Sequence, residues 1–197
     1  MMSDMIAGRL AGCELCDGRP TRGAVLGIDP GLAVTGYAVL SAGPGMPEAI
    51  LHEAGVIRLV RGQSLQSRLL HLEESLTALI RTHRPVCLVC EELYAHYRHP
   101  KTAILMGHAR GVVLVAAARL GLPVVSVGAT HVKKLLTGNG HASKRQMQSA
   151  VARMLGLSKL PEPPDVADAI AIAFCGLRQQ GGLTGRRRRL RSSEVPT

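Results

Sequence analysis

Aromatic side chains are scarce in this 197-residue sequence, which contains no Trp, three Tyr and one Phe. Domains that read single-stranded nucleic acid by stacking bases need an aromatic platform, so we do not expect a protein of that class. The sequence also lacks a secretory signal and any apolar run of the roughly 20 residues that span a bilayer. We therefore expect a soluble, intracellular protein with no membrane partner.

Cysteine is too rare and too irregularly spaced for a disulfide scaffold, because the chain has five cysteines and no secretory signal. Two CxxC pairs, Cys13 with Cys16 and Cys87 with Cys90, together have the ligand count of a Cys₄ zinc site. However, positions three apart on a strand point to opposite faces, so the second pair cannot share one ion without distortion. We do not expect zinc.

Negative charge is also in short supply. Lys and Arg number 24 against 14 Asp and Glu, a formal net charge of +10, which indicates a polyanionic partner. The chain is 46% hydrophobic, enough for one folded core. We expect a flexible extension over residues 1–23, a folded domain over 24–179 and a disordered Arg-rich tail over 180–197.

The hydrophobic pattern of residues 24–179 predicts an α/β domain. Three strand-like runs at the start form an antiparallel meander, and the later runs alternate between strand and helix periodicity. The expected strands lie within 24–31, 34–40, 53–60, 86–90 and 123–127, and the expected helices within 63–83, 102–120, 129–136, 143–156 and 165–179. This order describes a mixed five-stranded sheet flanked by helices, of the ribonuclease H-like kind.

Aspartate occurs only three times in the expected domain, each time at a defined place. Asp29 ends the first strand before a Pro-Gly turn, while Asp165 and Asp168 lie within one turn at the start of the last helix. Glu91 ends a central strand in the same manner as Asp29. We expect these four carboxylates to converge.

Four carboxylates packed together repel one another unless cations bind between them. Oxygen-only ligands favour hard ions such as Mg²⁺ or Mn²⁺, and two such ions about 3.5 to 4 Å apart support phosphodiester hydrolysis. A metal-dependent nuclease is consistent with the basic composition.

Each acid also has a structural explanation. Asp29 could belong to an ordinary turn, Glu91 could be a plain strand end, and Asp165 and Asp168 could cap a helix and suit its dipole. The functional interpretation is favoured because every aspartate of the domain falls at one of these places.

Five successive motifs resemble those of the RuvC family of bacterial Holliday-junction resolvases, over about residues 24–178. They are GIDPGLAVTGYAVL, CEELY, GHARG, VKKLLTGNGHASKRQMQ and PDVADAIAIA. The resemblance implies a two-metal site of Asp29, Glu91, Asp165 and Asp168 that holds two Mg²⁺ ions per subunit, with Mn²⁺ as a substitute. It also implies a homodimer that cuts four-way junction DNA by paired symmetric nicks in recombination and repair, in the bacterial cytoplasm at the nucleoid, with the RuvA-RuvB complex as a partner.

The resemblance further suggests DNA-contacting residues. Either Tyr94 or Tyr97 matches an aromatic that stacks at the opened junction, and Arg98 lies beside them. Lys133 and Lys144 match basic positions near the scissile phosphates, with Lys144 suited to stabilising transition-state charge. Both lysines could instead be solvated helix residues. Small residues of the helix expected over 102–120 permit close packing, either in the core or between two copies.

Two rival functions use the same features. An actin-like kinase or ATPase also has an Asp-x-Gly phosphate loop, but it usually needs a second domain, for which 197 residues leave little room. A catalytically silent junction-binding or transcription-linked relative of the same fold typically lacks one or more of the acids, whereas all four are present in this sequence.

Overall fold

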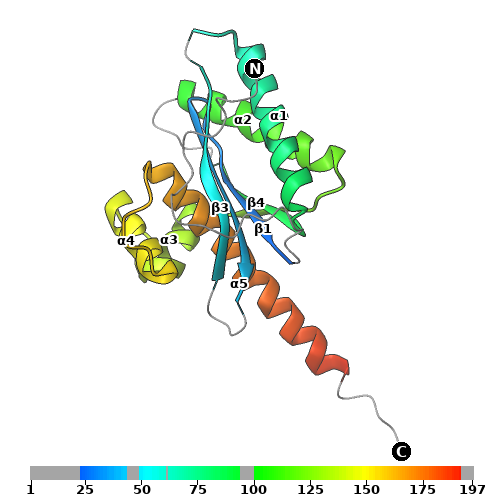
Figure 1. The fold of residues 1–197 in the computed structure, drawn as a ribbon, viewed down its shortest axis with the longest axis vertical. Helices are drawn as coiled ribbons and strands as arrows, with labels where there is room; N and C mark the ends of the chain where they lie inside the picture. Colours follow the sequence, from blue (N-terminus) through cyan, green and yellow to red (C-terminus); the bar gives the residue numbers. More distant parts are fainter. Residues whose placement is uncertain (1–22, 44–48, 61, 94–99, 192–197) are drawn as a thin grey trace, which may run out of the picture.

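Five strands form one mixed sheet in the order β3-β2-β1-β4-β5. Figure 1 shows β1, β3 and β4 of this sheet between the helices. The computed structural model describes residues 23–43, 49–60, 62–93 and 100–191, except for the side chains of 100–101 and 181–191. The first three strands pair antiparallel, and β4 and β5 add parallel to β1. The strands are β1 (Val25–Asp29), β2 (Val34–Ala42), β3 (Ala49–Arg58), β4 (Cys87–Glu91) and β5 (Val124–Val127).

Helices cover both faces of the sheet. The helices α1 and α2 pack together on one face, while α3, α4 and α5 pack on the other, where α5 contacts β1 and β2 most extensively. The helices are α1 (Leu65–His83), α2 (Pro100–Arg119), α3 (Ala129–Thr137), α4 (Lys144–Leu155) and α5 (Pro164–Arg191). The predicted mixed five-stranded sheet flanked by helices is confirmed.

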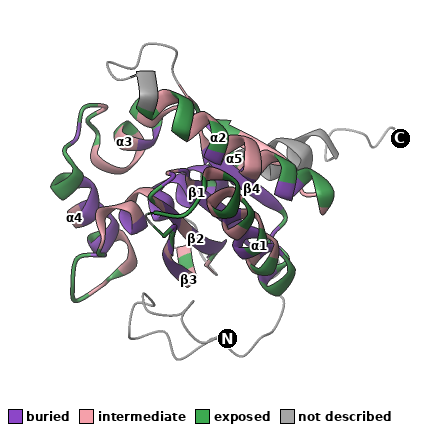
Figure 2. Cartoon of the chain, turned by 90° about the horizontal axis from the view of Figure 1, so that it is seen from above, coloured by how far each residue is buried: buried purple, intermediate pink, exposed green. Residues whose placement is uncertain are grey.

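Alternation along the central strands divides the core in two. In β4, Cys87 and Val89 belong to the cluster under α5, whereas Leu88 and Cys90 belong to the cluster under α1 and α2. Because both faces are covered, the strand reads as a continuous apolar run, and Figure 2 shows β1 and β4 as buried. Cys87 and Cys90 therefore do point to opposite faces, while Cys13 and Cys16 lie outside the described residues.

Glycine lets α5 lie directly on the sheet. A Cβ atom at Gly36 in β2 would stand 2.2 Å from the Asp165 carbonyl oxygen, and one at Gly27 in β1 would stand 2.5 Å from the Ala169 carbonyl oxygen. Strand and helix backbones are thus in contact without intervening side chains. The distance between α5 and the strands β1 and β2 is therefore set by contact between their backbones.

The helix α5 is longer than the sequence pattern predicted. It continues to Arg191, beyond the expected end near residue 179, so the tail expected to be disordered from residue 180 is helical over its first part. No proline interrupts the chain between Pro164 and Pro196, and Arg, Leu and Gln favour helix. The far end of α5 projects away from the sheet (Figure 1).

The helix α2 is apolar along most of its length. By length and composition alone, its segment Thr102–Arg119 is long and apolar enough to cross a membrane. This differs from the expectation that no apolar segment reaches such a length. Of this segment, 22% is buried inside the protein. Yet Ala109, Val113 and Ala116 are fully buried in the core under α1 and α2. The helix is therefore part of the folded domain and carries apolar side chains on an outer face as well.

We predict that Gly36→Ala lowers the free energy of unfolding by about 1 to 3 kcal/mol, because the added methyl group collides with the backbone of α5. Urea denaturation measures the change. The matched control is Gly111→Ala in α2, where a Cβ atom meets nothing within 4 Å and helix propensity raises stability by up to about 1 kcal/mol. A Gly36→Ala protein as stable as the parent would show that α5 can move away from β2 at little cost.

Candidate active site

Two acids lie side by side at the ends of neighbouring strands. Asp29 ends β1 and Glu91 ends β4, and these strands are parallel with Ile28 paired to Cys90, so the next positions on each are adjacent. By alternation from Val25 and Val89, both side chains belong to the face that α5 covers. The sheet itself therefore directs the two carboxylates toward the start of α5.

The other two acids come from the first turns of α5. Asp165 and Asp168 are one helical turn apart, and the contact of Gly36 with the Asp165 carbonyl places this helix end on β2. The preceding loop is anchored from α4, because the buried Gln148 side chain donates to the Pro161 carbonyl oxygen at 3.0 Å. The helix start is thus fixed by both the sheet and α4.

All four predicted acids line one pocket. Its wall also contains Lys133, Lys144 and Arg68, the turn of residues 30–34 after β1, and side chains from α2 and α4. Glu92, the neighbour of Glu91, is exposed and is not part of this wall. Within the described ranges, no three Asp, Glu, His or Cys side chains are already grouped closely enough to hold a metal ion.

Burial and repulsion by neighbouring acids make Asp29, Glu91 and Asp168 hard to ionise. Burial, followed by the charges of Asp168, Glu91 and Asp165, raises the pKa of Asp29 to about 7. Burial and the charge of Asp168 also raise the pKa of Glu91, and burial is the main cause of the raised pKa of Asp168. A site of oxygen ligands with this unfavourable negative charge fits hard divalent cations.

The two lysines predicted from the sequence are at the pocket. Lys144 is the first residue of α4, where Ser143 and Gln146 form a capping box with bonds of 3.3 and 2.8 Å. Its charge lowers the pKa of Asp29, and Lys133 on α3 lowers that of Glu91. Both lysines therefore act electrostatically on the acids, although burial outweighs them.

Arg68 at the start of α1 was not singled out from the sequence. Its Nη2 donates to the Leu32 carbonyl oxygen and its Nε is buried without a hydrogen-bond partner. In the same turn, the hydroxyl of the buried Thr35 donates to the Gly31 carbonyl oxygen at 2.7 Å and accepts from its N–H at 3.2 Å. These bonds hold the turn that follows Asp29. A single Arg in an amphipathic helix carries no sequence signal for this role.

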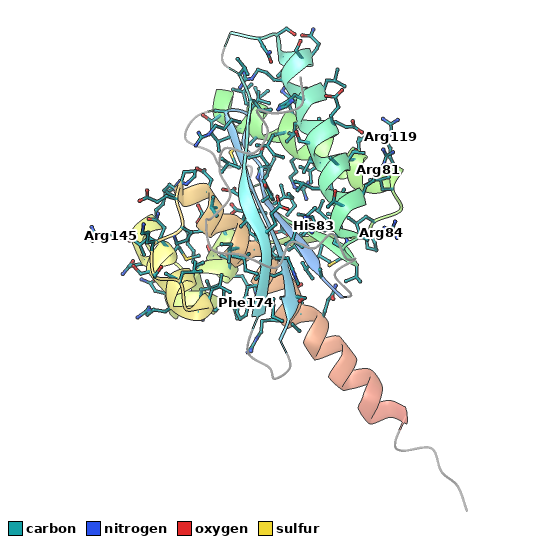
Figure 3. The ribbon with its side chains drawn as sticks, viewed as in Figure 1. Arg81, His83, Arg84, Arg119, Arg145 and Phe174 are labelled. Carbon is teal, nitrogen blue, oxygen red and sulfur yellow. The ribbon has the colours of Figure 1, made fainter. Side chains whose placement is uncertain are left out.

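The remaining predicted DNA contacts, Tyr94, Tyr97 and Arg98, lie outside the described residues. Elsewhere, exposed arginines are spread over opposite sides of the molecule. Arg81 lies on α1, Arg84 directly after it and Arg119 on α2, whereas Arg145 lies on α4 (Figure 3). The positive charge is therefore not confined to the pocket.

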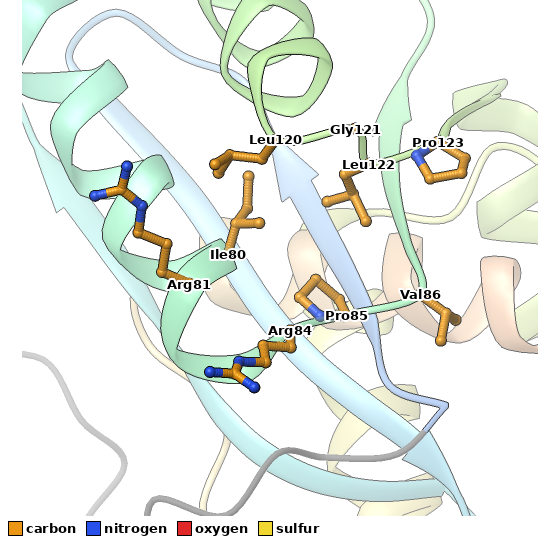
Figure 4. Close-up of a pocket in the computed structure, with 9 residues that line it drawn as sticks. All are labelled: Ile80, Arg81, Arg84, Pro85, Val86, Leu120, Gly121, Leu122 and Pro123. Atoms are coloured by element: carbon orange, nitrogen blue, oxygen red, sulfur yellow. The ribbon is translucent and has the colours of Figure 1, made fainter.

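A second hollow lies at the other end of the sheet, before β4 and β5 begin. It is lined by Ile80, Pro85 and Leu122 among others, with Arg81 and Arg84 (Figure 4). No carboxylate lines it. The acidic pocket at the carboxyl ends of β1 and β4 is therefore the candidate active site.

The sheet order and the acids at the ends of β1 and β4 define a nuclease of the ribonuclease H-like class. A profile of the family described as "Crossover junction endodeoxyribonuclease RuvC" matches residues 25–176. The chain belongs to the RuvC family. This membership argues against the actin-like alternative.

Relatives with established names support the assignment over most of the chain. The crossover junction endodeoxyribonuclease RuvC of Rhodopirellula baltica is 48% identical over 166 residues, which cover 84% of this chain and 92% of the relative. The RuvC protein of Salinispora arenicola is 41% identical over 157 residues, which cover 80% and 89%.

Solved structures agree with the fold. Thermus thermophilus RuvC in complex with a Holliday junction substrate superposes with a TM-score of 0.74 at 34% identity and covers 81% of this chain and 96% of that one. The yeast mitochondrial Holliday junction resolvase Ydc2, at 16% identity and a TM-score of 0.58, covers 88% and 86% and shares the fold.

We predict that Asp29→Asn stabilises the protein by about 1 to 3 kcal/mol at pH 8 in the presence of EDTA. The pKa of Asp29 is raised in the folded state, so its ionisation costs stability as pH rises from about 4 to about 7, and the cost persists above that range. A neutral amide removes it. Urea denaturation at pH 8 measures the gain.

The control for this stability change is Glu92→Gln, because Glu92 is exposed and lies outside the pocket wall. We expect its unfolding free energy to equal that of the parent. An Asp29→Asn protein less stable than the parent under these conditions would mean that Asp29 makes a stabilising interaction that outweighs the repulsion.

Proposed function

We propose that this protein is an endodeoxyribonuclease that resolves four-way DNA junctions by paired nicks in recombination and repair. The observation that carries the proposal is the meeting of four carboxylates from β1, β4 and α5 in one pocket bordered by lysines. A junction-bound relative with 34% identity supports the substrate.

The four acids would hold the cations. Asp29 and Glu91 lie at strand ends and Asp165 and Asp168 at the start of α5, so all four candidate ligands come from regular elements and line the same pocket. We infer two Mg²⁺ ions per subunit, with Mn²⁺ able to substitute. Such ions supply an activated water and stabilise the leaving oxygen in phosphodiester hydrolysis.

The protein's own cations would bind and orient the DNA backbone. Lys144 and Lys133 reach the pocket wall from α4 and α3, where each offsets the charge of nearby acids. A phosphate placed between them and the acids would gain charge-assisted hydrogen bonds. Lys144, which influences both Asp29 and Asp168, is suited to stabilise negative charge that develops during cleavage. Tyr94, Tyr97 and Arg98 remain proposed junction contacts.

We propose a homodimer that forms through the outer face of α2. Ile104 and Val115, eleven positions apart and therefore on one face of this helix, are 59% and 53% exposed, although they are large and apolar. A second copy of the chain would cover them and place two acidic pockets on one symmetric junction. The RuvA-RuvB complex as a partner and a cytoplasmic, nucleoid-associated location are further proposals, supported by family membership.

We predict that Asp29→Asn abolishes cleavage of a synthetic four-way junction in Mg²⁺, because it removes a cation ligand. Binding of the same junction should persist, since the basic surface is unchanged. Gel analysis of cleavage products and fluorescence anisotropy measure the two effects.

A matched linear duplex serves as the substrate control, and paired nicks should occur only in the junction. Cleavage by Asp29→Asn at the parental rate would show that the site is wrongly assigned. Tight binding without product from the parent protein, across Mg²⁺ and Mn²⁺ concentrations, would instead support the catalytically silent alternative.

We also predict that Ile104→Glu converts the dimer to a monomer, because a carboxylate would be buried against the second copy. Sedimentation velocity measures the change. The control is Leu70→Glu, which alters a similarly exposed residue of α1, 58% accessible, and should leave the dimer intact. A dimer that tolerates Ile104→Glu would place the interface elsewhere.

A further inference from the structure

Arg110 of α2 joins the ends of two strands. Its Nε donates to the carbonyl oxygen of Glu91, the last residue of β4, at 3.2 Å. Its Nη2 donates to the Ser126 hydroxyl of β5 at 2.8 Å. A guanidinium presents these donors in a fixed planar arrangement, so both contacts constrain the same group.

Glu91 needs such support because the sheet holds it from one side only. The pairing of β1 with β4 ends at Ile28 and Cys90, whereas β5 continues to pair Glu91 with Val127. The Glu92 N–H then donates to the Val127 carbonyl at 2.9 Å. Toward β1 the strand end has no further register partner, and the Arg110 contact supplies an additional fixed point.

Arg110 approaches from the face of the sheet opposite to the acids. Cys90 and the rest of the cluster under α1 and α2 lie on this face, which we call the rear face. Burial raises the pKa of the Cys90 thiol, and the nearby Arg110 lowers it in part, which places Arg110 on the rear face as well. The Glu91 side chain points to the front face, into the acidic pocket. Arg110 thus holds the Glu91 backbone without placing its cation among the ligands.

We propose that Arg110 is a positioning residue that holds Glu91 at the acidic pocket from behind the sheet. A guanidinium bonded directly to the Glu91 carboxylate would compete with divalent ions for it. Bonded instead to the Glu91 carbonyl oxygen, Arg110 holds the backbone and leaves the carboxylate available to an ion. The proposal rests on the proposed role of Glu91 as a cation ligand.

The test compares Arg110→Lys with the parent in junction cleavage. Lysine keeps the charge but cannot make both bonds, so we expect kcat to fall at least tenfold and the Mg²⁺ concentration for half-maximal cleavage to rise severalfold. Junction affinity measured in EDTA should stay within twofold of the parent. A general loss of folded protein would not shift the Mg²⁺ dependence of the remaining activity.

Two further variants separate positioning from folding. Ser126→Ala removes one of the two bonds with little risk to the core, and we expect a smaller shift of the Mg²⁺ dependence in the same direction. Arg119→Gln, on the same helix, alters an exposed guanidinium whose 3.6 Å ion pair is to Glu73 of α1, and it should behave as the parent. Sedimentation velocity verifies that all variants have the parental oligomeric state.

Parental rates and parental Mg²⁺ dependence in both Arg110→Lys and Ser126→Ala would overturn the inference, while cleavage by the parent would leave the proposed function in place. Failure of the parent itself to cleave junctions would refute the proposed function instead. An Arg110→Lys protein that loses junction affinity in EDTA, with unchanged Mg²⁺ dependence, would make Arg110 a DNA-binding residue and contradict the positioning role.

Discussion

Electrostatic repulsion among Asp29, Glu91, Asp165 and Asp168 is the constraint on which the rest of this structure depends. A flexible loop would let such acids separate or keep their protons. Burial, followed by the charges of the three neighbouring acids, raises the pKa of Asp29 to about 7. Two strand ends and one helix start hold them instead. The hydrophobic cores on both faces of the sheet provide the stability that this arrangement requires.

Positively charged side chains from the two helical layers make different contacts near the acids. On the front face, Lys133 and Lys144 line the pocket and moderate the acids. From the other helical layer, Arg68 bonds to the turn after β1 and Arg110 to the end of β4. One arginine thus bonds to the backbone at the end of β4 and another to the turn that follows β1, so cations contribute to geometry as well as to charge balance.

Short-range patterns in the sequence predicted most of the fold and the four acids. Continuous apolar residues such as those of β4 arise because both faces of the strand are buried, and acids at strand ends stand out because aspartate is rare. The contacts of Arg68 and Arg110 could not be predicted from the sequence. Each side chain bonds to a backbone carbonyl oxygen in a segment distant along the chain, and no local pattern signals such a bond. The sequence pattern predicted that α5 ends near residue 179, whereas the helix continues to Arg191. The prediction was wrong because a segment rich in glycine and arginine does not by itself stop a helix.

The backbone contact of Gly27 and Gly36 with α5 has a consequence for how this protein can vary. Most core positions can exchange one aliphatic side chain for another of similar volume, because neighbours repack around it. At these two glycines no side chain can yield, since the opposing atoms belong to the helix backbone. Substitution tolerance should therefore be low at these two glycines, although they are among the smallest residues in the chain. Homologues or designed variants that change at many other core positions should keep both.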